Sequence, residues 1–162
     1  MGVLKSKRKE SQLFVYDTYR KYATELLRTL SACLSAERFK NLNNFQLWFF
    51  DREIFYLQGD LHNIANEILQ ANSIYPTNES EYKERRNHQT SAIGYCHSIQ
   101  NDIISVFDLE SDCMKPILHI ANDFNNLEGL LKKWRKANKK VTVWNLVTLL
   151  ISAMWTTTVI LT

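Results

Sequence analysis

Clusters of basic residues are the feature of this sequence whose chemistry is easiest to name. Residues 81–89 hold a first group, and residues 132–140 hold six cations within nine positions. Clustered lysine and arginine side chains neutralise the phosphates of a nucleic acid, with salt-dependent affinity and little preference for base sequence. We therefore predict a nucleic-acid-binding surface made of Lys83, Arg85, Arg86, Lys132, Lys133, Arg135, Lys136, Lys139 and Lys140. The alternative is an ordinary solvated face whose cations complement the end of a helix.

Motifs for catalysis or for cofactor binding do not occur in the sequence. It has no GxxxxGK[ST], GxGxxG, GxSxG, HExxH or EF-hand pattern. Its four histidines could share a metal ion only if His62 and His119 converged from different helices. Its three cysteines lack a CxxC spacing, which favours reduced thiols in a cytoplasmic protein. We therefore predict a protein that is not an enzyme, with no catalytic residues, no metal and no cofactor.

The elements that carry these residues are predicted to be helices. Glycine (4) and proline (2) are scarce, as is usual for helices joined by short loops. Apolar residues recur at steps of three and four over four stretches, at about 10–33, 44–71, 79–107 and 114–137. The first helix is expected to begin near Glu10, and Asn78 is expected to cap the third. The chain is therefore predicted to be all-α: a basic N-terminal arm (1–9), then an antiparallel up-down-up-down four-helix bundle (10–140).

The second stretch has the most regular pattern. Trp48, Phe49 and Phe55 lie off its main apolar seam, so this helix is expected either to be central or to contact another subunit through a second face. Between them, residues 51–53 (Asp-Arg-Glu) are expected to form an exposed strip with local ion pairing, which is favoured over an acid–base site. The main seam has a heptad spacing and consists of Leu47, Phe50, Ile54, Leu57, Leu61, Ile64, Ile68 and Ala71.

In an up-down-up-down bundle, the start of the third helix and the end of the fourth lie at the same end. The two basic clusters are therefore expected to share one end of the molecule and to form a single phosphate-binding patch. Trp134 lies among these cations. It continues the apolar stripe of Leu127 and Leu131, which predicts a place in the last core layer and leaves base stacking as the alternative.

An uncharged C-terminal tail (141–162) directly follows the second basic cluster. Its 22 residues are enough to span a bilayer, and the flanking cations suit a cytoplasmic boundary. Its six threonines and its β-branched apolar residues also suit a segment that packs on the bundle or on a neighbour, or a poorly ordered end. The sequence leaves these arrangements open.

Two runs around the basic clusters resemble a known family. They are Arg-Arg-Asn-His-Gln-Thr-Ser-Ala-Ile-Gly-Tyr-Cys (85–96) and Leu-Leu-Lys-Lys-Trp-Arg-Lys-Ala-Asn-Lys-Lys (130–140), and Ala-Asn-Ser-Ile (71–74) stands shortly before a proline. Over roughly residues 13–140, the chain resembles the accessory variability determinant family, the four-helix-bundle accessory proteins of diversity-generating retroelements. The matching positions are Arg85, Arg86, Gln89, Trp134, Arg135, Lys136, Asn138 and Lys139.

This resemblance implies a homopentamer with a basic surface and no active site of its own. It implies binding to a reverse transcriptase and to its template RNA or RNA/cDNA, in support of mutagenic retrohoming. The modest net charge of +3 and the tail after Lys140 depart from the family pattern. The alternative function is a membrane-anchored helical bundle, with the tail as its transmembrane segment and a protein partner on the cytoplasmic face.

Overall fold

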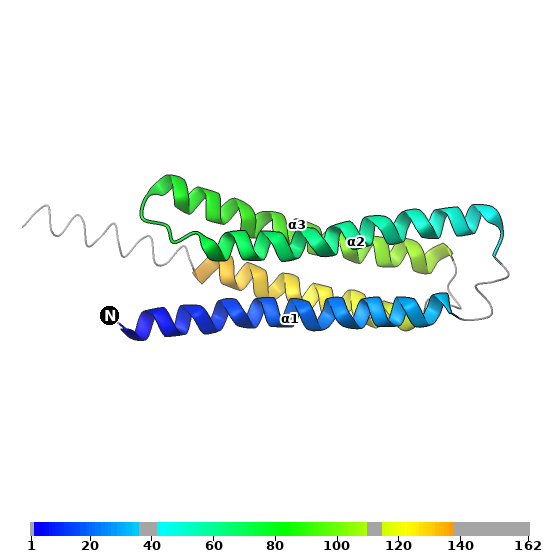
Figure 1. Cartoon of the computed structure of the whole chain (residues 1–162), viewed down its shortest axis with the longest axis horizontal. Coiled ribbons are helices and arrows are strands. Elements are labelled where there is room, and N and C mark those ends of the chain that lie inside the picture. The colour runs from blue at the N-terminus through cyan, green and yellow to red at the C-terminus, as the bar shows by residue number, and fades with distance from the viewer. Residues whose placement is uncertain (1, 36–41, 110–114, 138–162) are drawn as a thin grey trace, which may run out of the picture.

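The computed structural model describes residues 2–35, 42–109 and 115–137, and the regular structure in these ranges is entirely helical. Helix α1 spans Gly2–Leu34, α2 spans Asn44–Ser73 and α3 spans Glu79–Leu109. A short 3₁₀ turn, η2 (Lys115–Ile117), leads into a final α-helix at residues 118–137. The long helices lie side by side along one axis (Figure 1), so the predicted all-helical bundle is confirmed for the residues described.

Helix α1 begins at Gly2, earlier than the predicted start near Glu10. The residues of the expected arm, 1–9, therefore continue the first helix from residue 2 onward. Lysine, arginine and leucine are good helix formers, and no glycine or proline interrupts residues 3–34. Among the side chains that the structure describes, the buried stripe of α1 begins at Val15.

Side-chain caps set the first residues of α2 and α3. Asn43 Oδ1 accepts a hydrogen bond from the backbone N–H of Gln46 at 2.9 Å. The Gln46 side chain accepts one from the Asn43 N–H at 3.0 Å, which completes a capping box. Asn78 caps α3 as predicted, because its Oδ1 accepts from the Glu81 N–H at 3.0 Å.

Each helix contributes one buried stripe to a shared core. The predicted seam of α2 is confirmed from Leu57 onward, but before it Glu53 is buried in place of Ile54, and Leu47 is partly exposed. Arg52 Nη2 donates to Glu53 Oε1 at 3.2 Å, so the buried carboxylate has a partner and the expected local ion pair is present. The prediction that residues 51–53 form an exposed strip is wrong for Glu53, which is buried. The largest fully buried side chains are Phe50, Phe124, Leu26, Leu57, Ile64, Ile68, Ile99, Ile103, Ile117, Ile120 and Leu127.

The final helix runs antiparallel to α3. Gln100 Nε2 donates to Glu128 Oε2 at 3.0 Å, and Arg135 Nη1 donates to Thr90 Oγ1 at 3.1 Å. Moving toward the end of the final helix, each contact thus falls on an earlier residue of α3, as in antiparallel helices. The Arg135 contact ties the end of the final helix to the first half of α3, and the Gln100 contact ties its middle to the second half of α3.

Helix α1 joins the bundle partly through tyrosines. The Tyr19 hydroxyl donates to the Leu61 carbonyl of α2 at 2.7 Å. Burial raises the pKa of Tyr19 to about 12, so this hydroxyl stays protonated and remains a donor. The Tyr22 ring lies 6.4 Å from the ring of Phe124 in the final helix, measured between centroids.

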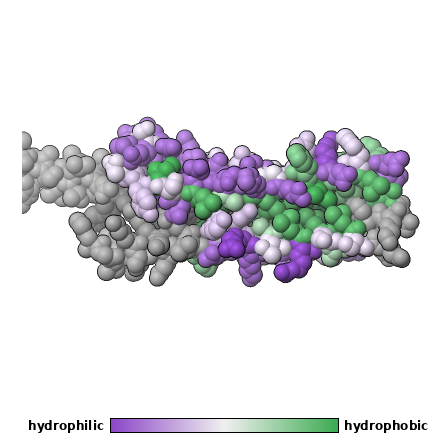
Figure 2. All heavy atoms as spheres, viewed as in Figure 1, coloured by the Kyte–Doolittle hydropathy of each residue, from purple (hydrophilic) through white to green (hydrophobic). Residues whose placement is uncertain are grey.

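The surface of the bundle is uneven. Hydrophobic residues gather on the half of the viewed face where α2 begins and α1 ends, whereas hydrophilic residues dominate where α3 begins (Figure 2). Among the described residues, none of the helices combines the length and the apolar character needed to cross a bilayer. The predicted tail (141–162) lies outside the described residues, and so do Lys139 and Lys140.

We expect Leu57→Ala to lower the free energy of unfolding by about 2–5 kcal/mol, because the Leu57 side chain is fully buried and its loss leaves a cavity. Chemical denaturation followed by circular dichroism measures this change. Leu69→Ala is the matched control on the same helix, since Leu69 is 47% exposed. Equal losses in the two variants would contradict the assignment of the core stripe.

A group of carboxylates lies between α2 and α3. Burial, together with the smaller effect of the nearby charges of Asp60 and Glu53, raises the pKa of Asp102 to about 6. The Asp102 Oδ2 atom is buried and has no hydrogen-bond partner among the described residues. The ionised form of Asp102 therefore opposes folding at neutral pH.

We expect Asp102→Asn to raise the stability of the protein at pH 7. The folded-state pKa of Asp102 lies above its ordinary value of 3.8, so the stability contributed by its protonated form is present below pH 4 and is lost as the pH rises through about 6. The variant should lack this loss, which thermal melting between pH 4 and pH 7.5 measures. Asp17→Asn, at an exposed site on α1, makes the same charge change. An identical pH profile for both variants would contradict this account.

Candidate nucleic-acid interface

The two predicted basic clusters lie next to each other at one end of the bundle. Arg135, in the last turns of the final helix, donates to Thr90 of α3. The guanidinium carbon of Arg85, near the start of α3, lies 5.9 Å from the ring centroid of Trp134. The structure therefore brings the start of α3 and the end of the final helix together, as the sequence predicted.

Helix α1 begins at the same end (Figure 1). Its first turns contain four cations and one carboxylate within residues 5–10, which adds a net charge of +3 to this end of the molecule. The sequence marked these residues as a separate arm and did not include them in the binding surface. Their position became evident only when α1 proved to be one continuous helix that starts here.

The structure corrects the prediction that Arg85 belongs to the nucleic-acid-binding surface. Its side chain is only 2% exposed, and its Nη1 donates to the Ile74 carbonyl at 3.2 Å, in the connection between α2 and α3. The guanidinium lies over Trp134, a cation–π arrangement that suits a buried arginine. Arg85 therefore joins three segments of the chain and offers no charge to a phosphate. Tyr82, three residues earlier on the same helix, is half-buried.

Trp134 is part of the core. Its side chain is 6% exposed and belongs to the buried cluster that includes Leu127 and Leu131. This confirms the prediction of a last core layer. An indole ring at this depth is not open to stacking with a base.

The start of α3 carries no net positive charge. Lys83 Nζ forms an ion pair with Glu79 Oε1 at 2.8 Å, and Arg86 Nη1 donates to the Tyr82 hydroxyl at 3.3 Å. Residues 79–86 contain three glutamates against three cations. The hydrogen bond from Lys83 lowers the pKa of Glu79, so this carboxylate is ionised at neutral pH. Lys83 and Arg86 therefore contribute little to an attractive field at this end.

The end of the final helix keeps its positive charge. Residues 129–137 contain Lys132, Lys133, Arg135 and Lys136 and no carboxylate. Lys132 forms an ion pair with Glu128 one turn earlier. Burial alone would raise the pKa of Glu128, but hydrogen bonds from Lys132 and Gln100 outweigh this effect and lower it. Lysine at i+4 from a glutamate is the pattern by which sequence alone could have identified this pair.

Lys133 and Lys136 have exposed side chains that stand one helical turn apart on the same face. Lys132 is exposed as well, but it forms the ion pair with Glu128. Arg135 lies beside them and is half-buried against α3. We call Lys132, Lys133, Arg135 and Lys136 the basic end of the bundle. Its cations also complement the negative end of the helix dipole. This stabilising effect is the structural explanation for the cluster, and it is the alternative to nucleic-acid binding.

Other polar groups of the bundle form pairs between neighbouring helices. His88 Nδ1 lies 2.7 Å from Glu67 Oε2, which links α3 to α2. Within the part of the chain that the structure describes, no three histidine, cysteine or acidic side chains lie close enough to hold a metal ion. Burial raises the pKa of the Cys96 thiol, which keeps it protonated and unreactive.

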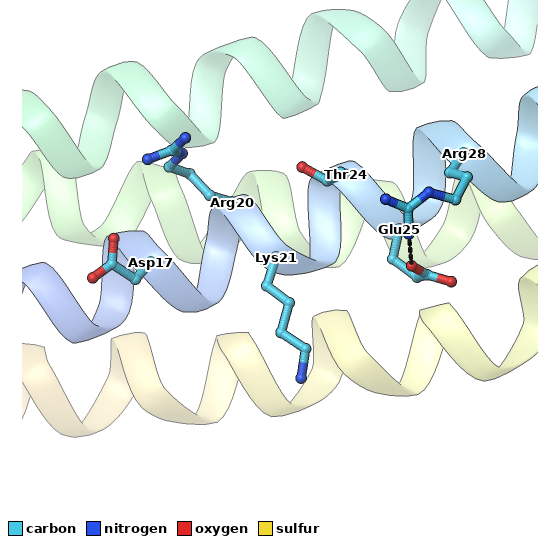
Figure 3. Close-up of a pocket in the computed structure, with 6 residues that line it drawn as sticks. All are labelled: Asp17, Arg20, Lys21, Thr24, Glu25 and Arg28. Atoms are coloured by element: carbon cyan, nitrogen blue, oxygen red, sulfur yellow. Dashed lines mark hydrogen bonds and ion pairs between the residues drawn. The ribbon is translucent and has the colours of Figure 1, made fainter.

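A shallow, open depression lies on α1 alone. Its lining residues point outward from a single helix (Figure 3), and Arg28 Nη1 forms an ion pair with Glu25 Oε2 at 3.0 Å. Alternating charges on one exposed helix form a solvated surface and not a converging set of catalytic groups. The lining residues are Asp17, Arg20, Lys21, Thr24, Glu25 and Arg28.

Comparisons of the sequence and of the fold with known proteins found no match. No protein-family model matches this chain, and no curated protein or solved structure matches it either. The resemblance to retroelement accessory proteins therefore rests on the residue runs at 71–74, 85–96 and 130–140 described above.

Proposed function

We propose that the chain is a non-catalytic accessory protein that binds RNA through the basic end of its helical bundle. The observation that carries this proposal is the group of four cations in the last turns of the final helix, among which no carboxylate occurs. Lys133 and Lys136 project from this group into solvent. The first turns of α1, with a net charge of +3 over residues 5–10, start at the same end (Figure 1).

The mechanism is electrostatic. Cations that neutralise backbone phosphates release the counterions condensed on the RNA, and this release drives binding without readout of the bases. The cations of Lys133 and Lys136 lie on a rigid helix whose inner face is fixed by buried Leu131 and Trp134. Such a surface holds RNA in place for a partner enzyme and needs no acid, base or metal of its own.

The resemblance to the accessory variability determinant family supplies the partners in this proposal. They are a reverse transcriptase and its template RNA or RNA/cDNA, and the process is mutagenic retrohoming. An up-down-up-down order of the four helices and a homopentameric assembly belong to the same proposal. Repetition of one basic end in an oligomer raises the avidity for RNA without any new contact within a subunit.

Reversal of the two exposed cations should weaken RNA binding. We expect the double variant Lys133→Glu/Lys136→Glu to bind a mixed-sequence single-stranded RNA at least tenfold more weakly at moderate salt. The slope of log K against log salt should also fall by about 1.5, because two phosphate contacts are lost. Fluorescence anisotropy over a series of salt concentrations measures both quantities.

The matched control is Arg20→Glu/Arg28→Glu, which makes the same change in net charge in the second half of α1. This control should change the affinity far less, and circular dichroism should show equal helicity in both variants. Equal affinity of the two variants, or an unchanged salt slope in the first, would remove the binding role from the basic end. Co-purification with a co-expressed reverse transcriptase from the same locus tests the partner separately.

A further inference from the structure

A second row of residues runs along α2, opposite to its core stripe. Its members follow a 3-4-3-4-3 spacing, and every one of them is exposed. The aromatic members are 64% (Phe45), 54% (Trp48) and 72% (Phe55) exposed. We call this row the outer seam of α2; it consists of Phe45, Trp48, Arg52, Phe55, Gly59 and His62.

Contacts within the helix organise the outer seam. The rings of Phe45 and Trp48 have centroids 5.9 Å apart, and the Arg52 guanidinium lies 4.9 Å from the Trp48 ring centroid. Tyr56 flanks the row, is 53% exposed and lies 6.1 Å from Phe55, ring to ring. The helix therefore presents aromatic side chains that are already packed against one another in the monomer.

The exposed aromatic area is large enough for a stable contact. A fully exposed aromatic side chain offers roughly 200 Å², so Phe45, Trp48, Phe55 and Tyr56 together leave about 500 Å² uncovered. Two such surfaces would bury about 1,000 Å² from their aromatic groups alone, which reaches the lower size limit of specific interfaces. Hydrophobic residues also gather at this half of the molecule (Figure 2).

We propose that the outer seam is the contact between two copies of this chain, with α2 of one copy antiparallel to α2 of the other. The two-fold axis passes between Arg52 and Phe55. In this register Trp48 faces Gly59 of the second copy, and Phe45 faces its His62. A Cβ atom placed on Gly59 would meet no described atom within 4 Å, so the glycine leaves open space for the indole ring.

Charge selects the antiparallel register. In it, Arg52 faces Phe55 of the second copy, which allows a cation–π contact across the interface. Asp51 faces Tyr56, so no carboxylate opposes another. A parallel pair would instead place Arg52 against Arg52 and Asp51 near Asp51, with repulsion at both positions.

The charge of this segment also separates the outer seam from the RNA-binding surface. Residues 44–63 contain Asp51, Glu53 and Asp60 against the single cation Arg52, and this negative balance disfavours a nucleic acid. The dimer contact therefore stands independently of the proposed function. In the proposed dimer, the two basic ends would lie about 60 Å apart. The basic end of each copy lies near the C-terminal end of α2, which is about 20 residues, or about 30 Å, from the two-fold axis.

The experiment compares the solution mass of the purified full-length protein with that of the variant Gly59→Gln, by light scattering at tens of micromolar. The glutamine has room in the monomer and suits a helix better than glycine, but it fills the space that Trp48 of the second copy would occupy. We expect an even number of subunits for the wild type, ten if the homopentamer of the proposed function also forms, with half that mass for the variant and unchanged helicity. Ile104→Gln, at an exposed position of α3, should leave the mass unchanged.

A double variant Trp48→Cys/Gly59→Cys, in a Cys113→Ser background, tests the register. Oxidation should link the two copies, whereas Gly59→Cys alone should not, because the two Gly59 positions would lie about 16 Å apart along the helices. A monomeric wild type would overturn the proposal. An odd-numbered assembly that Gly59→Gln leaves intact, or cross-linking by Gly59→Cys alone, would overturn it as well.

Discussion

Burial of one stripe per helix in a common core is the constraint on which the rest of this structure depends. Once Leu57, Ile99 and Leu131 point inward, the rotation of each helix is fixed, and the outward residues are fixed with it. The same constraint places Arg85 inside, because it falls on the buried stripe of α3. It places Lys133 and Lys136 outside, because they fall on the opposite side of the final helix from Leu131.

The distribution of charge follows from these rotations and from the antiparallel packing of the final helix against α3. The described cations of the final helix lie at one end of the bundle, and α1 begins at the same end. Carboxylates of α2 and α3 face each other in the other half, where Asp60 and Glu53 raise the pKa of Asp102. A modest net charge of +3 thus conceals two regions of opposite sign. Such separation allows one molecule to attract a polyanion at one end and to keep it away from the other.

Helix α2 is apolar on two sides for different reasons. Its inner side carries aliphatic residues such as Leu61 and Ile64, which fill the core between helices. Its outer side carries aromatic residues and an arginine, a composition enriched at protein interfaces. The proposed two-fold contact uses the outer side, and the proposed RNA contact uses the far end of the bundle. The two roles therefore do not compete for the same residues.

The sequence by itself determined the helical class, the approximate helix ranges, the capping role of Asn78 and the meeting of the two basic clusters. These features depend on local periodicity, on capping chemistry and on the number of helices, all of which are encoded over short distances. Only the tertiary structure decided that Arg85 is buried against Trp134 and that Gln100 of α3 donates to Glu128 of the final helix. Burial and hydrogen bonds between helices depend on which neighbour a side chain meets, and a one-residue shift along a helix turns a side chain by about 100° from core toward solvent.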